Sequence, residues 1–225
     1  YVLAVALLGN GVPAFLFTAA QTQLSSSLTG ALNSLVPLFA LLIGAMVFGK
    51  QPTRHQQIGV GIGLAGALLL ILLGNGQALG SVNSFALLVV IATVCYASSA
   101  TIIKSRLQAY SSLTITSSSI PVLVAPALLY LLLAEPPAAP ASEGAWISLG
   151  AVFTLGFVGT ALALLLFYHL IGTTNALFAT SVTYLMPVVA LFWGWVDGEW
   201  IAPMQILGMA TILGGVYLIH RGNVS

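Results

Sequence analysis

Two similar stretches decide the fold, LVPLFALLIGAMVFGK at residues 35–50 and LMPVVALFWGWVDGE at residues 185–199. Each places a proline after two apolar residues, continues as an apolar run, and ends in a glycine followed by one charged residue. The offset between the copies is 150 residues up to Gly194 and 149 from Gly198 onward. The glycines of the following segments repeat as well: Gly59 and Gly66 match Gly208 and Gly215. This self-match indicates two copies of one structural unit.

The composition places both copies in a membrane. Of the 225 residues, 59% are hydrophobic and 4% are charged, and the net charge is +1. A soluble domain carries roughly 25% charged residues, so a cytosolic enzyme, a secreted disulfide scaffold and a nucleic-acid-binding protein are all excluded. The apolar runs are continuous, whereas a membrane β-barrel alternates apolar and polar residues in segments of about ten. We therefore predict an all-α integral membrane protein, a polytopic helical bundle.

The gaps between the charged residues give the number of membrane spans, because a transmembrane helix needs about 20 apolar residues. Five uncharged gaps have room for two, two, one, two and one spans: 1–49, 55–103, 107–134, 144–196 and 200–220. Turn residues divide the three longest gaps. We therefore predict eight helices, at 1–21, 26–48, 56–73, 84–104, 113–133, 146–171, 175–196 and 203–219.

The charged residues also predict the orientation. If residue 1 starts inside, the cations all fall inside and the acids all fall outside: Lys50, Arg54, Lys104, Arg106 and Arg221 against Glu135, Glu143, Asp197 and Glu199. This segregation follows the positive-inside bias of multi-pass membrane proteins. We therefore expect a multi-pass protein of the inner (plasma) membrane with a cytoplasmic C-terminus.

In this orientation the two copies are inverted, because residues 35–50 run inward and residues 185–199 run outward. Inverted repeats are an architecture of secondary transporters, which bind substrate near the midplane and work by alternating access. Inversion requires an odd number of spans per unit. The unit at 77–225 has five and the unit at 1–76 has three. We therefore expect that the first repeat is incomplete, that two N-terminal helices are absent from this sequence, and that the intact protein has ten.

Two sets of Pro, Gly and Asn positions match a known family. The first repeat contains Asn10-Gly11-Val12-Pro13-Ala14-Phe15, Gln21, Ser25 to Asn33 and Pro37. The second contains Tyr184 to Ala190, Gly198-Glu199 and Gly208 to Gly215-Val216. These stretches resemble the third and fourth, and the ninth and tenth, helices of EamA-type transporters of the drug/metabolite transporter superfamily. Lys50 departs from the family, which usually has an acid there. The resemblance implies an inner-membrane carrier, commonly an exporter of amino acids or other small metabolites.

Uncharged polar residues within the spans are the candidate substrate-binding residues, because the resemblance places their helices around the central cavity. They are Asn10, Gln21, Asn33, Ser34, Thr180, Thr183 and Tyr184. The alternative for each is interhelical hydrogen bonding, worth about 0.6 kcal/mol per pair, and a hydroxyl can also bond to its own helix. Pro37 and Pro187 each remove a backbone donor. They are predicted helix breaks that indicate the binding region.

Other motifs have simpler interpretations. Residues 61–66 match the dinucleotide pattern G-x-G-x-x-G but lack its preceding strand and its acidic residue. Gly59 and Gly63 instead form a small-residue face for close helix packing. His169 is a candidate proton carrier, although a packed or interfacial histidine is the commoner case. Cys95 is the one cysteine, so no intrachain disulfide is possible.

The predicted spans contain no Asp or Glu, so their lining suits a neutral or zwitterionic solute. We therefore predict a secondary transporter that moves a small, amino-acid-like metabolite, in the direction of export. We expect no catalytic residues, no metal, no cofactor and no nucleic-acid partner, and a monomer or homodimer that binds its substrate within the lipid bilayer. A channel-like or structural membrane subunit is the alternative. An intramembrane enzyme is a more remote one, because no nucleophile elbow accompanies the serines.

Overall fold

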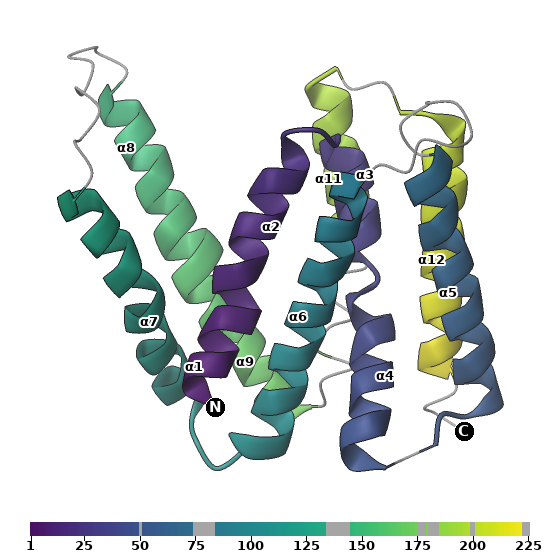
Figure 1. Cartoon of the computed structure of the whole chain (residues 1–225), viewed down its shortest axis with the longest axis horizontal. Helices are drawn as coiled ribbons and strands as arrows, with labels where there is room; N and C mark the ends of the chain where they lie inside the picture. Colours follow the sequence, from purple (N-terminus) through teal and green to yellow (C-terminus); the bar gives the residue numbers. More distant parts are fainter. Residues whose placement is uncertain are drawn as a thin grey trace.

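The computed structural model describes residues 1–49, 51–73, 84–133, 145–174, 179, 185–198 and 201–221. All elements in this part of the chain are helical (Figure 1). They are α1 (Val2–Ala6), η1 (Leu7–Gly11), α2 (Val12–Gln21), α3 (Ser26–Asn33), α4 (Val36–Phe48), α5 (Arg54–Leu73), α6 (Ser84–Arg106), α7 (Ser112–Leu133), α8 (Ala145–Thr154), η2 (Leu155–Leu162), α9 (Ala163–Thr173), α11 (Leu185–Val196) and α12 (Pro203–Arg221). The predicted all-α fold is confirmed.

The described helices correspond to the predicted spans. Six segments are long and apolar enough to cross a membrane: Val2–Gln21, Ser26–Phe48, Arg54–Leu72, Ser84–Arg106, Ser112–Leu129 and Trp146–Thr173. Two shorter apolar helices, Met186–Val196 and Pro203–Ile219, account for the last two predicted spans. The first half of the seventh predicted helix falls almost entirely outside the described residues.

The second predicted span consists of two helices rather than one. Helix α3 ends at Asn33, and α4 begins at Val36 with Pro37 in its first turn. Between them the chain tightens, because the Ser34 amide donates to the Ala31 carbonyl at 3.2 Å and the Leu35 amide to that of Leu32 at 3.1 Å. A proline in a first helical turn lacks only an N–H that would have no helical partner there. The chain therefore changes helix in the middle of this span.

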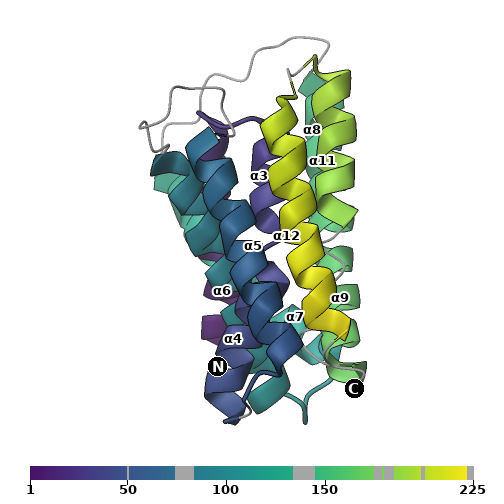
Figure 2. The ribbon, with the colours of Figure 1, turned by 90° about the vertical axis from the view of Figure 1, so that its right-hand side faces the viewer.

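Among the described helices, α5 and α12 form the most extensive contact, antiparallel along their length (Figure 2). Glycines let their backbones touch. A methyl group added at Gly215 would lie 2.6 Å from the carbonyl oxygen of Gly59 and 2.6 Å from the amide nitrogen of Gly63. A methyl group at Gly66 would lie 2.9 Å from the carbonyl oxygen of Gly208. The predicted small-residue face is thus confirmed as a helix–helix contact.

These glycine contacts follow the symmetry of the repeat. Gly59 corresponds to Gly208 and Gly66 to Gly215 in the sequence, and the observed pairs are Gly59 with Gly215 and Gly66 with Gly208. A two-fold axis exchanges the two copies. If a residue of the first copy contacts a residue of the second, the equivalent of each must also be in contact. The α5–α12 contact therefore has the pattern of a two-fold axis between the repeats.

Two further features occur at equivalent places in both copies. The described residues with positive φ are Gly49 at 66° and Gly198 at 74°, and these end α4 and α11 in the left-handed conformation that glycine adopts readily. The two π-helical segments are η1 and η2. Shifted by the repeat offset of 150, residues 7–11 fall within η2. Short π-helical turns mark local departures from regular α-helix, and the sequence analysis did not predict them.

The described charges lie at opposite ends of the bundle. One end of the bundle holds the chain start, the α4–α5 and α6–α7 connections and the last turn of α12 (Figure 1). The α11–α12 connection is at the other end of the bundle. Arg54 begins α5, Lys104 and Arg106 lie in the last turn of α6, and Arg221 ends α12. The described acid, Asp197, follows α11 at the opposite end. The described cations therefore share one end of the bundle.

Candidate functional site

The junction of α3 and α4 brings polar groups of the first repeat against α11 of the second. Asn33 is buried, with 2% of its surface exposed. Its amide Nδ2 donates to the sulfur of Met186 at 2.7 Å, across 153 residues of sequence. Its Oδ1 and the hydroxyl of Thr29, one turn earlier, are buried without a hydrogen-bond partner. We call Thr29, Asn33 and Met186 the junction cluster.

Close backbone packing holds the junction cluster in place. Gly30 faces Ala190 of α11 so closely that a methyl group at position 30 would overlap the Ala190 side chain. Pro187 is buried next to Met186, at the start of described α11. α3 is capped at its start because the Leu28 amide donates to the Ser25 hydroxyl at 3.2 Å. The two repeats therefore meet at the point where the first one changes helix.

The remaining predicted site residues have different surroundings. Ser34 is fully buried, and its hydroxyl donates to the Ala31 carbonyl at 2.5 Å, within its own segment. Gln21 is exposed at the end of α2. Thr180, Thr183 and Tyr184 lie outside the described residues, so their part in the site stays a prediction. Asn10 lies on η1, away from the junction cluster.

A second group of polar side chains gathers around Tyr168, where η1, α6, α7 and α9 meet. A methyl group at Gly9 would lie 2.6 Å from the hydroxyl oxygen of Ser99 and 3.5 Å from that of Tyr168. The side chains of Asn10 and Ser119 lie within reach of the same Tyr168 hydroxyl. We call Gly9, Asn10, Ser99, Ser119 and Tyr168 the Tyr168 cluster.

The Tyr168 cluster is only partly satisfied. The Ser99 hydroxyl donates to the Val5 carbonyl at 3.3 Å and the Ser119 hydroxyl to the Ile115 carbonyl at 2.7 Å. The Tyr168 hydroxyl and the Asn10 Nδ2, however, are buried without a partner of good geometry. A buried polar group without a partner costs about 1–3 kcal/mol. The cluster can therefore accept a polar solute or a water molecule.

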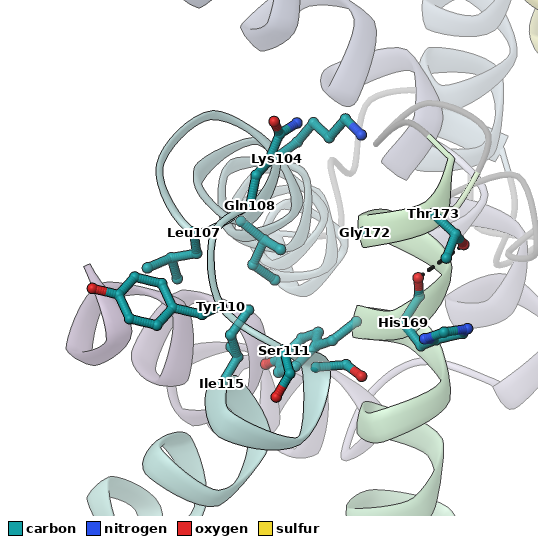
Figure 3. Close-up of a pocket in the computed structure, with 12 residues that line it drawn as sticks. Lys104, Leu107, Gln108, Tyr110, Ser111, Ile115, His169, Gly172 and Thr173 are labelled. Atoms are coloured by element: carbon teal, nitrogen blue, oxygen red, sulfur yellow. Dashed lines mark hydrogen bonds between the residues drawn. The ribbon is translucent and has the colours of Figure 1, made fainter.

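Next to Tyr168 a pocket of about 220 Å³ lies between the last turn of α6, the start of α7 and the end of α9 (Figure 3). Its wall includes Lys104 and Gln108, while Leu107 and Ile115 are apolar parts of the lining. The Lys104 Nζ donates to the Thr174 carbonyl at 2.6 Å, which ties α6 to the end of α9. The pocket is at the cationic end of the bundle.

His169 belongs to the wall of this pocket through its backbone. Its carbonyl accepts a hydrogen bond from the Thr173 hydroxyl at 3.0 Å, and its ring lies on the side of α9 away from α6 (Figure 3). The imidazole is exposed rather than packed among polar groups. The geometry therefore gives no support to a proton-carrying role in this pocket.

Three residues of these clusters were not among the candidates predicted from the sequence: Tyr168, Ser119 and Thr29. Tyr168 and Ser119 come from helices that the family resemblance did not single out, and their meeting depends on how α7 and α9 pack. A signal existed for Thr29, which lies four residues before Asn33 and therefore on the same helix face. Within the described ranges, no group of three or more His, Cys, Asp or Glu side chains could hold a metal ion.

Comparisons with known proteins agree with this architecture. The model of the EamA-like transporter family matches residues 1–72 and 83–221. An "uncharacterized transporter" of Archaeoglobus fulgidus is 25% identical over 222 residues, covering 98% of this chain and 77% of the relative. The "uncharacterized inner membrane transporter YedA" of Escherichia coli K12 is 27% identical, covering 96% and 67%.

A third relative carries a more specific name. It is a "probable amino-acid metabolite efflux pump" of Salmonella typhimurium, 29% identical over 228 residues, covering 94% of this chain and 75% of the relative. The fold also matches a crystal structure with a TM-score of 0.65 at 19% identity, covering 97% of this chain and 74% of that one. The chain therefore belongs to the EamA-like transporter family of the drug/metabolite transporter superfamily, which consists of multi-pass membrane transporters and not of enzymes.

Proposed function

We propose that this transporter carries a small neutral or zwitterionic metabolite, of amino-acid type, by alternating access of its two repeats. The observation that carries the proposal is the uncharged, partly unpartnered junction cluster between the repeats. Its free groups are the Asn33 Oδ1 and the Thr29 hydroxyl. A solute held there would contact both copies at once, as inverted-repeat carriers require.

The chemistry of the described polar groups supports a solute without net charge. The junction cluster and the Tyr168 cluster offer amides, hydroxyls and a thioether, and neither contains an acid or a cation. Lipid cannot satisfy such groups. A solute with hydrogen-bonding groups and a partly apolar body fits them better than a phosphate or another polyanion would. Asn10, Asn33, Ser34 and Gln21, with Thr180, Thr183 and Tyr184, remain the proposed binding residues, to which we add Thr29 and Tyr168.

Substrate class and direction rest on two further supports. One relative's name refers to amino-acid metabolite efflux, which favours an amino-acid-like solute and export. The shared end of the described cations favours a cytoplasmic position for that end and for the C-terminus in the inner membrane. We propose that the repeats divide at residues 76 and 77, with Pro37 and Pro187 at equivalent helix breaks, and that the protein acts as a monomer or homodimer.

The test is countertransport into liposomes that contain the purified protein. A carrier should take up a labelled amino acid faster when the same amino acid is present on the other side, because the loaded protein reorients faster than the empty one. A channel gives no such stimulation. An uptake rate that is the same with and without amino acid on the other side of the membrane would therefore contradict the proposal. Failure to move any of the twenty amino acids would contradict the substrate class.

A further inference from the structure

The pocket beside Tyr168 combines a cation with an apolar wall. Among the described lining residues, Lys104 carries the positive charge, and none of the lining residues is Asp or Glu. The ammonium group has three N–H donors, and the Thr174 carbonyl accepts from one of them. In the part of the chain that the structure describes, no carboxylate lies within ion-pair distance of Lys104.

Neutral donors lie next to this charge. Gln108 lies in the turn that follows α6, two residues after its end at Arg106, and also lines the pocket. Figure 3 shows the Lys104 side chain extending from α6 toward the end of α9. Ser112 begins α7 and also lines the pocket. The first turn of a helix favours negative charge. At α7 the Thr114 amide already donates to the Ser111 hydroxyl at 3.1 Å, so the helix dipole and not a free Thr114 amide adds to the effect of Lys104.

Another part of the pocket lining is apolar and includes Tyr168 of the Tyr168 cluster. Ile103, Leu107 and Ile115 line it together with Tyr168, whose hydroxyl is buried without a partner of good geometry. A ligand that fills about 220 Å³ between Lys104 and these side chains would need a negative group at one end and an apolar body at the other. A monocarboxylate with a short aliphatic side chain has this form.

Resting on the proposed function, we propose that this pocket is an entry site that binds the carboxylate of the transported metabolite. Lys104 binds the carboxylate, Gln108 and the start of α7 donate to it, and the aliphatic part lies against Leu107 and Ile115. The pocket is thus a loading site at the cytoplasmic end, separate from the junction cluster. An organic amine without a carboxylate would not be held there.

The first test measures the charge preference of the pocket with cysteine reagents of opposite sign. Cys95→Ala removes the one cysteine, and Ser112→Cys then places a thiol in the pocket with little change of size. The protein, in nanodiscs that expose both faces, is labelled with an anionic sulfonatoethyl or a cationic trimethylammonioethyl methanethiosulfonate. The same thiolate attacks the sulfenyl sulfur of either reagent, which forms a disulfide and releases methanesulfinate. The ratio of the two rates is therefore independent of the reactivity of the thiolate.

We expect the anionic-to-cationic rate ratio to fall about five- to tenfold on Lys104→Gln, because one unit charge acts on reagents of opposite sign across a few ångströms of wet pocket. Lys104→Arg should keep the ratio. Arg106→Gln is the matched control, because that cation lies over the Tyr1 ring, 5.6 Å from its centroid, and does not line the pocket; it should change the ratio less than twofold. An unchanged ratio in Lys104→Gln overturns the proposal.

The second test measures recognition of the carboxylate. Labelling of Ser112→Cys by an uncharged methanethiosulfonate is repeated with each of the twenty amino acids and with isoamylamine, which is leucine without its carboxylate. Amino acids with aliphatic side chains should slow labelling at least threefold, isoamylamine should not, and Lys104→Gln should abolish the protection. Equal protection by the amine, or none by any amino acid, overturns the inference. Countertransport that persists in that case leaves the proposed function standing. An anion-selective pocket without countertransport contradicts the proposed function and the loading role of the pocket, and leaves only its binding of carboxylates.

Discussion

The close contact between α5 and α12 makes Gly215→Ala a sharp test of the inverted packing. The added methyl group would lie 2.6 Å from the backbone of Gly59 and of Gly63, and ordinary van der Waals contact begins at 3.4 Å. Backbone atoms cannot rotate away, so the two helices must separate by about 0.8 Å, the difference between these distances. A gap of 0.5–1 Å loses roughly a quarter to a half of each contact's attraction. Overpacking of this kind costs about 1–3 kcal/mol.

Gly214→Ala is the matched control one residue away. Gly214 is exposed, and a methyl group there would meet nothing within 4 Å. Both substitutions gain about 0.5–1 kcal/mol because alanine is the better helix former, so this effect cancels between them. We therefore expect Gly215→Ala to be less stable than Gly214→Ala by about 1–3 kcal/mol, or about 2–4 °C in Tm for each kcal/mol.

The natural Cys95, half-buried in α6, reports on unfolding. Purified variants in nanodiscs are heated with a dye that fluoresces on reaction with thiols, and the midpoints are compared. Gly61→Ala, which also has open space around it on α5, extends the control to the other helix. Equal midpoints for Gly215→Ala and Gly214→Ala would refute the close backbone contact between the two copies.

Three further predictions concern the two polar clusters. Tyr168→Phe removes a hydroxyl that has no hydrogen-bond partner of good geometry. We therefore expect unchanged or slightly higher thermal stability together with transport lowered several-fold, while the exposed Tyr217→Phe changes neither. A loss of stability would show that the hydroxyl is firmly bonded to Asn10 or Ser119. Asn33→Ala should lower countertransport about five- to tenfold, because about 1–1.5 kcal/mol of hydrogen bonding to the solute is lost. Normal transport by a variant that inserts normally into the membrane would show that Asn33 does not belong to the site. Gly30→Ala should separate α3 from α11 and destabilise the protein by about 1–3 kcal/mol. Gly44→Ala is the control and should not, because a methyl group at position 44 would meet no atom within 4 Å. Equal melting curves for the two variants would contradict the junction geometry.

The sequence was sufficient to predict the fold because membrane insertion imposes simple rules. The positions of the charged residues bounded the spans, and the structure has helices at those places. The spacing of Gly59 and Gly63 indicated a close helix contact because small residues let helix backbones approach each other. These features depend on residue type and spacing alone, so a single sequence contains them.

The candidate site was only partly predictable because it depends on three-dimensional packing. Asn33 was identified, but its Met186 partner, 153 residues away, is apolar and gave no polar signal. Tyr168 was missed because it becomes a site residue only when η1 brings Asn10 to it. The π-helical turn could not be predicted from hydropathy, because η1 and its flanking helices form one continuous apolar run. Gln21 was predicted as a site residue from its polarity alone. In the structure it is exposed because α2 ends at this residue.

Inverted repeats are the central claim, and the most direct measurement locates their equivalent corners relative to the membrane. In a Cys95→Ala background, Lys50→Cys and Glu199→Cys are labelled with a membrane-impermeant maleimide, first in intact cells and then after permeabilisation. We predict that Glu199→Cys reacts in intact cells and that Lys50→Cys reacts only after permeabilisation. Labelling of both corners from the same side would contradict the inversion, and with it the alternating-access account.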